Sequence, residues 1–259
     1  MACLKSKAVN VGVLRMKGIW DIHNHILPGV DDGASTYEET YQMVAEAYRQ
    51  GVRGIIFTPH YRAGMFEVSR KEQIQVFQET VAELRAEFPD MFFCLGCEYY
   101  IHQDAVATLD VAAYRIAATK AVLVEFSTRK SFATMREAVA RIVASGYTPI
   151  IAHCERYRCL VDAPERVGIL KQIGAKIQLN ADSVLMNTGP VARYCKQLLT
   201  ENQVDFIASD AHDSKHRGIK LADSYRMVEK RYGKGLAEQI FAKNPKSLFP
   251  KAFFEPTNH

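Results

Sequence analysis

The amino-acid sequence predicts a parallel α/β fold, built either as a barrel or as an open, doubly wound sheet. Seven apolar runs of strand length recur along the chain, and segments with helical periodicity separate them. Most of the turns between these segments contain glycine or proline. Strands that alternate with helices in this way usually pair in parallel. The runs are Ile19–His23, Gly54–Thr58, Phe92–Glu98, Ala121–Glu125, Thr148–Ala152, Lys176–Asn180 and Asp205–Ser209.

Helices are expected where apolar residues recur at helical spacing. Two of them are preceded by a serine that is followed three residues later by a glutamate, a pattern typical of a capping box. These pairs are Ser35 with Glu38 and Ser69 with Glu72. Further helices are predicted at Thr134–Ser145, Pro164–Gln172, Pro190–Glu201, Lys220–Arg231 and Gly235–Ala242.

The composition is that of an ordinary globular protein. The 259 residues are 48% hydrophobic and 24% charged, with a net charge of +4. No linker of Pro, Ser and Gly divides the chain, so we expect one domain over residues 19–259 after an N-terminal extension over residues 1–18. Without a dense Lys/Arg run we expect no nucleic-acid partner. Without an 18-residue apolar segment we expect no insertion into a membrane.

Cysteine usage favours a reducing compartment. The six cysteines stand at positions 3, 94, 97, 154, 159 and 195, and only Cys94 and Cys97 form a C-x-x-C pair. No second pair with zinc-ribbon spacing follows, and the pair lies inside an apolar run. We therefore expect free thiols in the core and a cytoplasmic protein.

Six of the predicted strands end in residues that can bind a metal ion. In a parallel α/β fold the carboxyl ends of the strands open onto one rim, where ligands bind. Two residues spaced i and i+2 on an extended chain point to the same side, as in the H-x-H and D-x-H pairs. The rim residues are His23, His25, His60, Glu98, Glu125, His153, Asp210 and His212.

Each of these residues has a simpler explanation when it is taken alone. A single histidine after a strand is usually hydrogen-bonded in a loop, and Glu98 or Glu125 could pair with a surface Lys or Arg. Together, however, the imidazoles and carboxylates would leave unpaired polar groups and repelling charges without a cation. Nitrogen and oxygen ligands without thiolate favour Mn²⁺, Fe²⁺ or Zn²⁺. Two or three bridged ions fit the number of ligands, and such clusters catalyse phosphoryl transfer.

The ordered motifs resemble the PHP (polymerase and histidinol phosphatase) superfamily. They are H-x-H after the first strand, Thr-Pro-His after the second, isolated glutamates, Ala-His, and Asp-x-His. The stretches Asp21–Ala34 and Ala152–Tyr157 are similar to bacterial capsule-type tyrosine phosphatases of the CpsB/YwqE kind. The resemblance covers residues 19–250 and implies the PHP fold, a distorted TIM-like barrel of about seven βα units. That number agrees with the seven predicted strands.

The resemblance also implies roles for individual residues. It implies three ions, usually manganese, with Glu98 shared between the first and the second. The implied sets are His23, His25, Glu98 and Asp210; Glu98, Glu125 and His153; and Asp32, His60 and His212. Arg156 and Arg217 match positions that contact phosphate, and an Arg fork suits phosphate oxygens. We further expect Tyr100 and His102 to line the slot for the phosphotyrosine.

The resemblance implies hydrolysis of phosphotyrosine on a bacterial tyrosine autokinase of capsular or exopolysaccharide synthesis. Histidinol phosphate or another small phosphomonoester stays open as the substrate, and a homo-oligomer stays open as the assembly. A nuclease or polymerase-associated module is disfavoured because no basic stripe is present. A regulatory module without chemistry is disfavoured because every motif position is kept. A cysteine-nucleophile phosphatase is excluded, since it needs Arg six residues after Cys and the residues there are Val9, Tyr100, Gln103, Leu160, Glu165 and Glu201.

Overall fold

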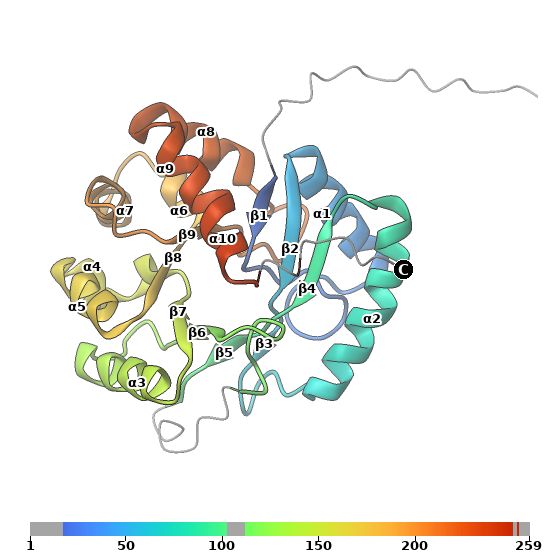
Figure 1. Ribbon diagram of the computed structural model, residues 1–259, viewed down its shortest axis with the longest axis horizontal. Helices are drawn as coiled ribbons and strands as arrows, with labels where there is room; N and C mark the ends of the chain where they lie inside the picture. The colour runs from blue at the N-terminus through green and yellow to red at the C-terminus, as the bar shows by residue number, and fades with distance from the viewer. Residues whose placement is uncertain (1–17, 103–111, 251–252, 254–259) are drawn as a thin grey trace, which may run out of the picture.

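The strands of the protein form a curved parallel wall surrounded by helices (Figure 1). The computed structural model describes residues 18–102, 112–250 and 253; the predicted extension over residues 1–18 lies outside these ranges except for Gly18. The named strands pair in parallel, in the orders β1-β2-β4 and β3-β5-β6-β7-β8-β9. They are β1 (Ile19–Asp21), β2 (Val52–Phe57), β3 (His60–Tyr61), β4 (Phe92–Leu95), β5 (Glu98–Tyr100), β6 (Ala121–Glu125), β7 (Thr148–Ile151), β8 (Lys176–Asn180) and β9 (Phe206–Ala208).

These nine strand segments occupy seven positions in the wall, because two strands are interrupted. β2 continues into β3 after Thr58 and Pro59, and β4 continues into β5 after Gly96 and Cys97. Backbone hydrogen bonds bridge the interruption: the Gly96 N–H donates to the Phe57 carbonyl at 2.7 Å, and the Glu98 N–H donates to the Pro59 carbonyl at 3.1 Å. The predicted strand Phe92–Glu98 is thus broken in two, whereas the prediction of seven strand positions in a parallel α/β fold is confirmed.

The wall closes beyond the ends of β1 and β9. The Asp210 N–H donates to the His23 carbonyl and the His25 N–H donates to the Ala211 carbonyl, both at 2.8 Å. The buried Asp21 carboxylate accepts bonds from Ser209 Oγ at 2.6 Å and from the Ser209 N–H at 3.0 Å. The barrel is therefore distorted, and its seam is held by the same segments that carry the H-x-H and D-x-H pairs.

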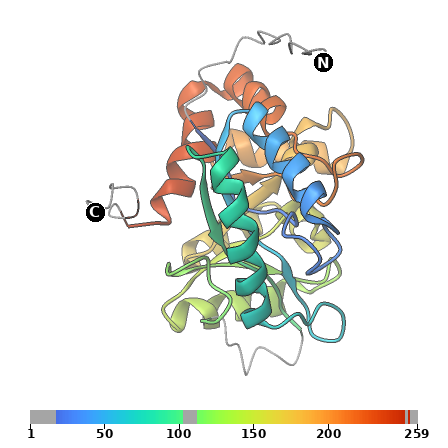
Figure 2. The same cartoon turned by 90° about the vertical axis from the view of Figure 1, so that its right-hand side faces the viewer.

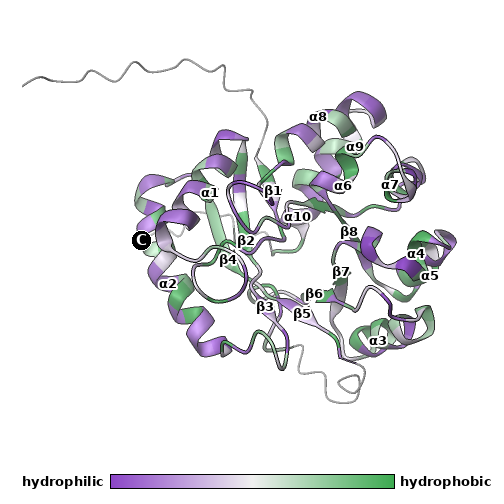
Figure 3. Ribbon diagram, turned by 180° about the vertical axis from the view of Figure 1, so that it is seen from behind, coloured by the Kyte–Doolittle hydropathy of each residue, from purple (hydrophilic) through white to green (hydrophobic). Residues whose placement is uncertain are grey.

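The helices lie outside the strands, and each of the longer ones carries both hydrophilic and hydrophobic residues (Figure 3). Helices α1 and α2 lie side by side on one face of the molecule (Figure 2). The helices are α1 (Tyr37–Arg49), α2 (Arg70–Glu87), α3 (Phe132–Ala144), α4 (Arg158–Val161), α5 (Glu165–Ile173), α6 (Ala181–Leu185), α7 (Pro190–Thr200), α8 (Leu221–Tyr232), α9 (Lys234–Glu238) and α10 (Asn244–Ser247), with a 3₁₀ turn η2 (Cys154–Arg156) and a π-helical turn η3 (Gln239–Lys243).

Most helix predictions agree with the structure within two residues at each end. The predicted helix Gly235–Ala242 is divided between α9 and η3, and the short helices α4 and α6 were not predicted. The capping box of Ser69 and Glu72 is confirmed. The box of Ser35 and Glu38 is wrong by one position.

Thr36, rather than Ser35, caps helix α1. Its side chain accepts a bond from the Glu39 N–H at 3.3 Å. Ser35 cannot take that place because its own N–H and hydroxyl both donate to the Glu39 carboxylate, each at 3.0 Å. The serine hydroxyl therefore binds a side chain and leaves the first-turn N–H to the threonine.

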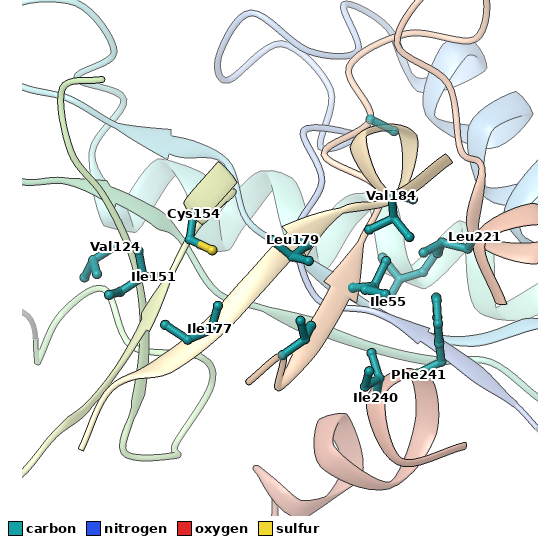
Figure 4. Packing of buried hydrophobic residues seen from close by; sticks show 14 of the residues in the cluster. Ile55, Val124, Ile151, Cys154, Ile177, Leu179, Val184, Leu221, Ile240 and Phe241 are labelled. Carbon is teal, nitrogen blue, oxygen red and sulfur yellow. The ribbon is translucent and has the colours of Figure 1, made fainter. Parts of the chain in front are cut away.

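The two faces of the wall carry separate apolar clusters, because successive strand residues point to opposite sides. Ile55 and Ile151 belong to the larger cluster, which includes the buried faces of the helices, whereas their neighbours Ile56 and Ile150 belong to the smaller one. Figure 4 shows Ile177 and Leu179 of β8 in the larger cluster.

The cysteines of the C-x-x-C pair are buried free thiols, as predicted. Burial raises the pKa of both Cys94 and Cys97, which keeps the thiols protonated at neutral pH. None of the described helices combines the length and the apolar character that a membrane crossing requires.

Gly54 gives a test of the packing inside the wall. A Cβ atom at this position would lie 2.3 Å from the ring of Trp20, which is 2% exposed and has no room to shift freely. We expect Gly54→Ala to lower the free energy of unfolding by about 1–3 kcal/mol, measured by chemical denaturation.

Gly168 in α5 provides the control, because a Cβ there would meet no heavy atom within 4 Å. Gly168→Ala should raise the free energy of unfolding by up to about 1 kcal/mol, since alanine favours a helix. Equal effects of the two substitutions would contradict this description of the packing.

Candidate metal centre

The structure brings all nine predicted ligands together at the carboxyl ends of the strands. Asp32 lies in the loop between β1 and α1, and His60 and Glu98 begin β3 and β5 after the two interruptions. The other six stand at or just beyond strand ends. The nine residues fall into four overlapping groups, in each of which the nitrogen and oxygen atoms lie within 4.8 Å of one another. The groups are His25, Asp32, His60 and His212; His23, Glu98 and His153; His23, His25 and Asp210; and His60, Glu98 and Glu125.

Glu98 lies at the centre of this cluster and is 1% exposed. Its Oε2 is 3.2 Å from Nε2 of His23, 3.2 Å from Nε2 of His25 and 3.1 Å from Nδ1 of His60. Its Oε1 is 2.9 Å from Nε2 of His153.

The buried polar atoms of the cluster are incompletely satisfied by the described residues. Glu98 Oε2, Glu125 Oε2 and His60 Nδ1 have no hydrogen-bond partner in acceptable geometry, although each lies among other polar atoms. Unpaired buried polar atoms that converge on a small volume are costly, and cations of suitable size remove that cost. The residues present therefore fit a group of divalent ions.

Two of the nine predicted ligands have backbone conformations that are rare outside glycine. His153 has a φ of +30° and Asp210 a φ of +50°. Such left-handed conformations cost on the order of 1 kcal/mol or more and are concentrated at functional sites. The two residues turn sharply out of their strands at the rim.

Asp31 fixes the orientation of His25 and was missed by the sequence analysis. Its Oδ2 accepts a bond from His25 Nδ1 at 2.8 Å and another from the His60 N–H at 2.8 Å. With Nδ1 engaged in this way, Nε2 of His25 is free to bind a cation. The available signal was the Asp31-Asp32 pair in the motif, of which only the second member was predicted as a ligand.

Burial and the neighbouring charges shift the pKa values of several groups in the cluster. Burial alone would disfavour both charges, but the ion pair with His25 lowers the pKa of Asp31 to about 2 and raises the pKa of His25 well above its usual value. Burial, together with the charge of His25, lowers the pKa of His60 to about 4 and that of His212 to about 3. Burial, and then the charge of Glu98, raises the pKa of Glu125 to about 7.

Arg156 and Arg217 both lie on the outer oxygen of Asp210. Asp210 Oδ2 accepts from Nη2 of Arg156 at 2.7 Å and from Nη2 of Arg217 at 3.1 Å. The two side chains are 38% and 43% exposed. Because two guanidinium groups share one carboxylate oxygen, positive charge remains available at the edge of the cluster. This arrangement suits a tetrahedral anion placed next to the ions.

Aromatic rings surround the side of the cluster next to β3 and β5. Phe66 stacks on the ring of His60 with 5.1 Å between centroids and 7° between planes. The guanidinium of Arg62 lies 4.2 Å from the ring centre of Tyr100, and the His102 ring lies 4.8 Å from it. Phe66 and Arg62 were not selected from the sequence, because a loop between a strand and a helix carries no periodic signal.

Comparison with known proteins adds independent evidence to this geometry. A family model described as capsular polysaccharide synthesis, CpsB/CapC, matches residues 19–250. The chain belongs to the CpsB/CapC family. Its CpsB/CapC relatives include tyrosine-protein phosphatase CpsB of Streptococcus agalactiae, 34% identical over 88% of this chain and 97% of that protein. Tyrosine-protein phosphatase YwqE of Bacillus subtilis is 30% identical over 83% of this chain and 86% of that protein.

Solved structures show the same fold. A structure from work on YwqE of Bacillus subtilis and CpsB of Streptococcus pneumoniae, described as unique metal-dependent tyrosine phosphatases, superposes with a TM-score of 0.80 and 28% identity, covering 89% of this chain and 94% of that one. An amidohydrolase from Mycoplasma synoviae superposes with a TM-score of 0.60 at 12% identity, covering 90% of this chain and 88% of that one. The latter likeness concerns the fold alone.

Asp31 provides a test of the centre that leaves the nine ligands in place. In Asp31→Asn the buried negative charge behind His25 is lost while the size is kept, so the affinity for Mn²⁺ should fall roughly 10- to 100-fold. Competition with a fluorescent chelator measures this affinity. Asp90→Asn is the control, because Asp90 forms an exposed ion pair with Arg53 and should leave the affinity unchanged. Equal affinities of the two variants would show that Asp31 does not support the centre.

Proposed function

We propose that this protein is a metal-dependent protein-tyrosine phosphatase. The observation that carries the proposal is the placement of two exposed guanidinium groups directly beside a buried cluster of histidines and carboxylates, through their shared contact with Asp210. The CpsB and YwqE relatives, which are named tyrosine-protein phosphatases, support the substrate class. The proposed substrate is phosphotyrosine on a bacterial tyrosine autokinase of capsular or exopolysaccharide synthesis.

The eight rim residues and Asp32 would hold two or three ions. Manganese is the proposed metal, and Fe²⁺ or Zn²⁺ would also suit nitrogen and oxygen ligands without thiolate. When bound, the ions would lower the pKa of water and neutralise phosphate charge. The proposed sets, carried over from the family resemblance, are His23, His25, Glu98 and Asp210; Glu98, Glu125 and His153; and Asp32, His60 and His212. The structure groups the same nine residues differently, with His25 beside Asp32, His60 and His212, and with Glu125 beside His60 and Glu98.

Arg156 and Arg217 would bind and orient the phosphate. Hydrolysis forms a P–O bond to the water oxygen and breaks the P–O bond to the tyrosyl oxygen, and negative charge collects on the remaining oxygens. The two guanidinium forks are suited to stabilise that charge. The phenol has a pKa of about 10, so it can leave with little help from an acid. Asp210 would serve both functions, with Oδ1 toward the cluster and Oδ2 holding the arginines.

We further propose that residues 19–259 act as one catalytic domain in the cytoplasm. The match of the family model over residues 19–250 supports the first part. The free thiols of the described cysteines, Cys94, Cys97, Cys154, Cys159 and Cys195, fit a reducing compartment.

The substrate class is tested by comparing specificity constants. The Mn²⁺-loaded protein should hydrolyse a phosphotyrosyl peptide with a much higher kcat/KM than histidinol phosphate. His153→Ala removes one of the predicted metal ligands, so this variant should bind less metal and hydrolyse neither substrate. It measures the background rate of the assay. A higher constant for histidinol phosphate would contradict the proposed substrate.

Substitution of Arg156 tests phosphate binding separately from metal binding. Arg156→Ala should keep its metal content by elemental analysis but lose about 100-fold or more in kcat/KM, because one donor to the developing charge is removed. Arg158→Ala is a matched control two residues later, since that side chain is 86% exposed and pairs with Asp162. Full activity of Arg156→Ala would show that its proposed role is wrong.

A further inference from the structure

β8 is the one position in the seven-membered wall that supplies none of the nine ligands. It carries two carboxamides instead, Gln178 and Asn180, which are 0% and 1% exposed. A carboxamide has two N–H donors and two acceptor positions on its oxygen. When it is buried, these groups need hydrogen-bond partners within the protein. The partners of the Gln178 and Asn180 side chains are each other and residues of the proposed metal centre.

The two amides form a continuous chain of hydrogen bonds. Gln178 Oε1 accepts from the His153 N–H at 2.7 Å and from His23 Nδ1 at 3.0 Å. Gln178 Nε2 donates to Asn180 Oδ1 at 2.9 Å. Asn180 Nδ2 donates to Asp210 Oδ2 at 2.7 Å. The chain therefore connects His23 to Asp210 across the wall.

The two ends of the chain determine every orientation within it. A backbone N–H such as that of His153 can only donate, so the oxygen of Gln178 must face it. A carboxylate such as that of Asp210 can only accept, so the nitrogen of Asn180 must face it. With both amides fixed, His23 must carry its proton on Nδ1, and its Nε2 lone pair is directed to the cluster.

The same chain assigns the two oxygens of Asp210. Oδ2 accepts three donors, from Asn180, Arg156 and Arg217. Oδ1 lies 3.5 Å from Nε2 of His23 and 3.5 Å from Nε2 of His25. Oδ1 is thus the oxygen that faces the ions, and Oδ2 the one that faces the phosphate arginines.

We propose that Gln178 and Asn180 are positioning residues, which set the tautomer of His23 and the rotation of the Asp210 carboxylate together. This inference rests on the proposed metal centre. His25 is backed by the charged Asp31, whereas His23 is backed by a neutral amide. A carboxylate makes an imidazole more basic than an amide does, so the two members of H-x-H are unequal donors. Glu155, which is buried and accepts from the Asn180 N–H at 3.1 Å, anchors the chain.

Gln178→Met tests the proposal, because methionine keeps the length and loses both kinds of hydrogen bond. We expect the affinity for Mn²⁺, from chelator competition, to fall roughly 10- to 100-fold. In Zn²⁺-loaded protein labelled with ¹⁵N-histidine, the slowly exchanging Nδ1–H signal of His23 should disappear. Gln178→Glu keeps the acceptor for His23 and His153 but loses the donor to Asn180, so it should restore the His23 signal.

Asn180→Ala tests the other end of the chain. It should retain the His23 signal and lower kcat, because Asp210 Oδ2 loses the buried one of its three donors and keeps only the two arginines. Gln50→Met is the control: Gln50 donates to the Ile219 carbonyl and accepts from the Ala222 N–H, so it also bridges distant segments. It should lose stability while the His23 signal and the Mn²⁺ affinity stay unchanged.

An unchanged His23 signal and unchanged Mn²⁺ affinity in Gln178→Met would overturn the proposal. If that variant does not fold, a Gln178→Glu protein without the signal, or an Asn180→Ala protein with wild-type kcat, would overturn it. The proposed metal centre fails separately, if the wild-type protein itself takes up no Mn²⁺. A wrong substrate class would leave these results unchanged, because neither the His23 ring N–H signal nor the Mn²⁺ affinity depends on the phosphoester used.

Discussion

The hydrogen bonds between the segments after β1 and β9 are the constraint on which the site depends. They bring Asp210 beside His23 and Ala211 beside His25, from opposite ends of the sequence. Asp21 and Ser209 support this seam through a buried hydrogen bond between residues 188 positions apart. Because the seam closes only beyond the strands, the backbone at Asp210 is free to adopt a left-handed turn, and the carboxylate can face both the histidines and the arginines.

The cluster around Glu98 lowers the stability of the fold without cations, and the same cluster forms the proposed metal centre. A buried carboxylate surrounded by four imidazoles from three strand positions leaves oxygen and nitrogen atoms without hydrogen bonds. Nothing in the apolar clusters relieves that cost, so the bound cations would have to do so. Asp31 and Gln178 hold the Nδ1 atoms of His25 and His23, and Asn180 connects Gln178 to Asp210. The Nε2 lone pairs of both histidines are thereby directed into the cluster, where cations would bind.

Much of this organisation could be predicted from the sequence. Hydrophobic periodicity located the seven strand positions, and the rule that parallel strands end at one rim predicted that His153 and Glu125 would meet. Local competition was harder to foresee. Thr36 caps α1 because Ser35 is engaged by Glu39. β4 and β5 separate at Gly96 and Cys97, at the same level as the break between β2 and β3, and hydrogen bonds from Gly96 and Glu98 bridge the two breaks.

The sequence by itself determined which chemical groups stand at the strand ends and in which order. The tertiary structure decided how those groups are aimed. His23 depends on Gln178, 155 residues away, and Asp210 depends on Asn180 and two arginines. The physical reason is that strand and helix periodicity reflect local burial, whereas an imidazole tautomer or a carboxylate rotation is set by partners that meet only when the barrel closes.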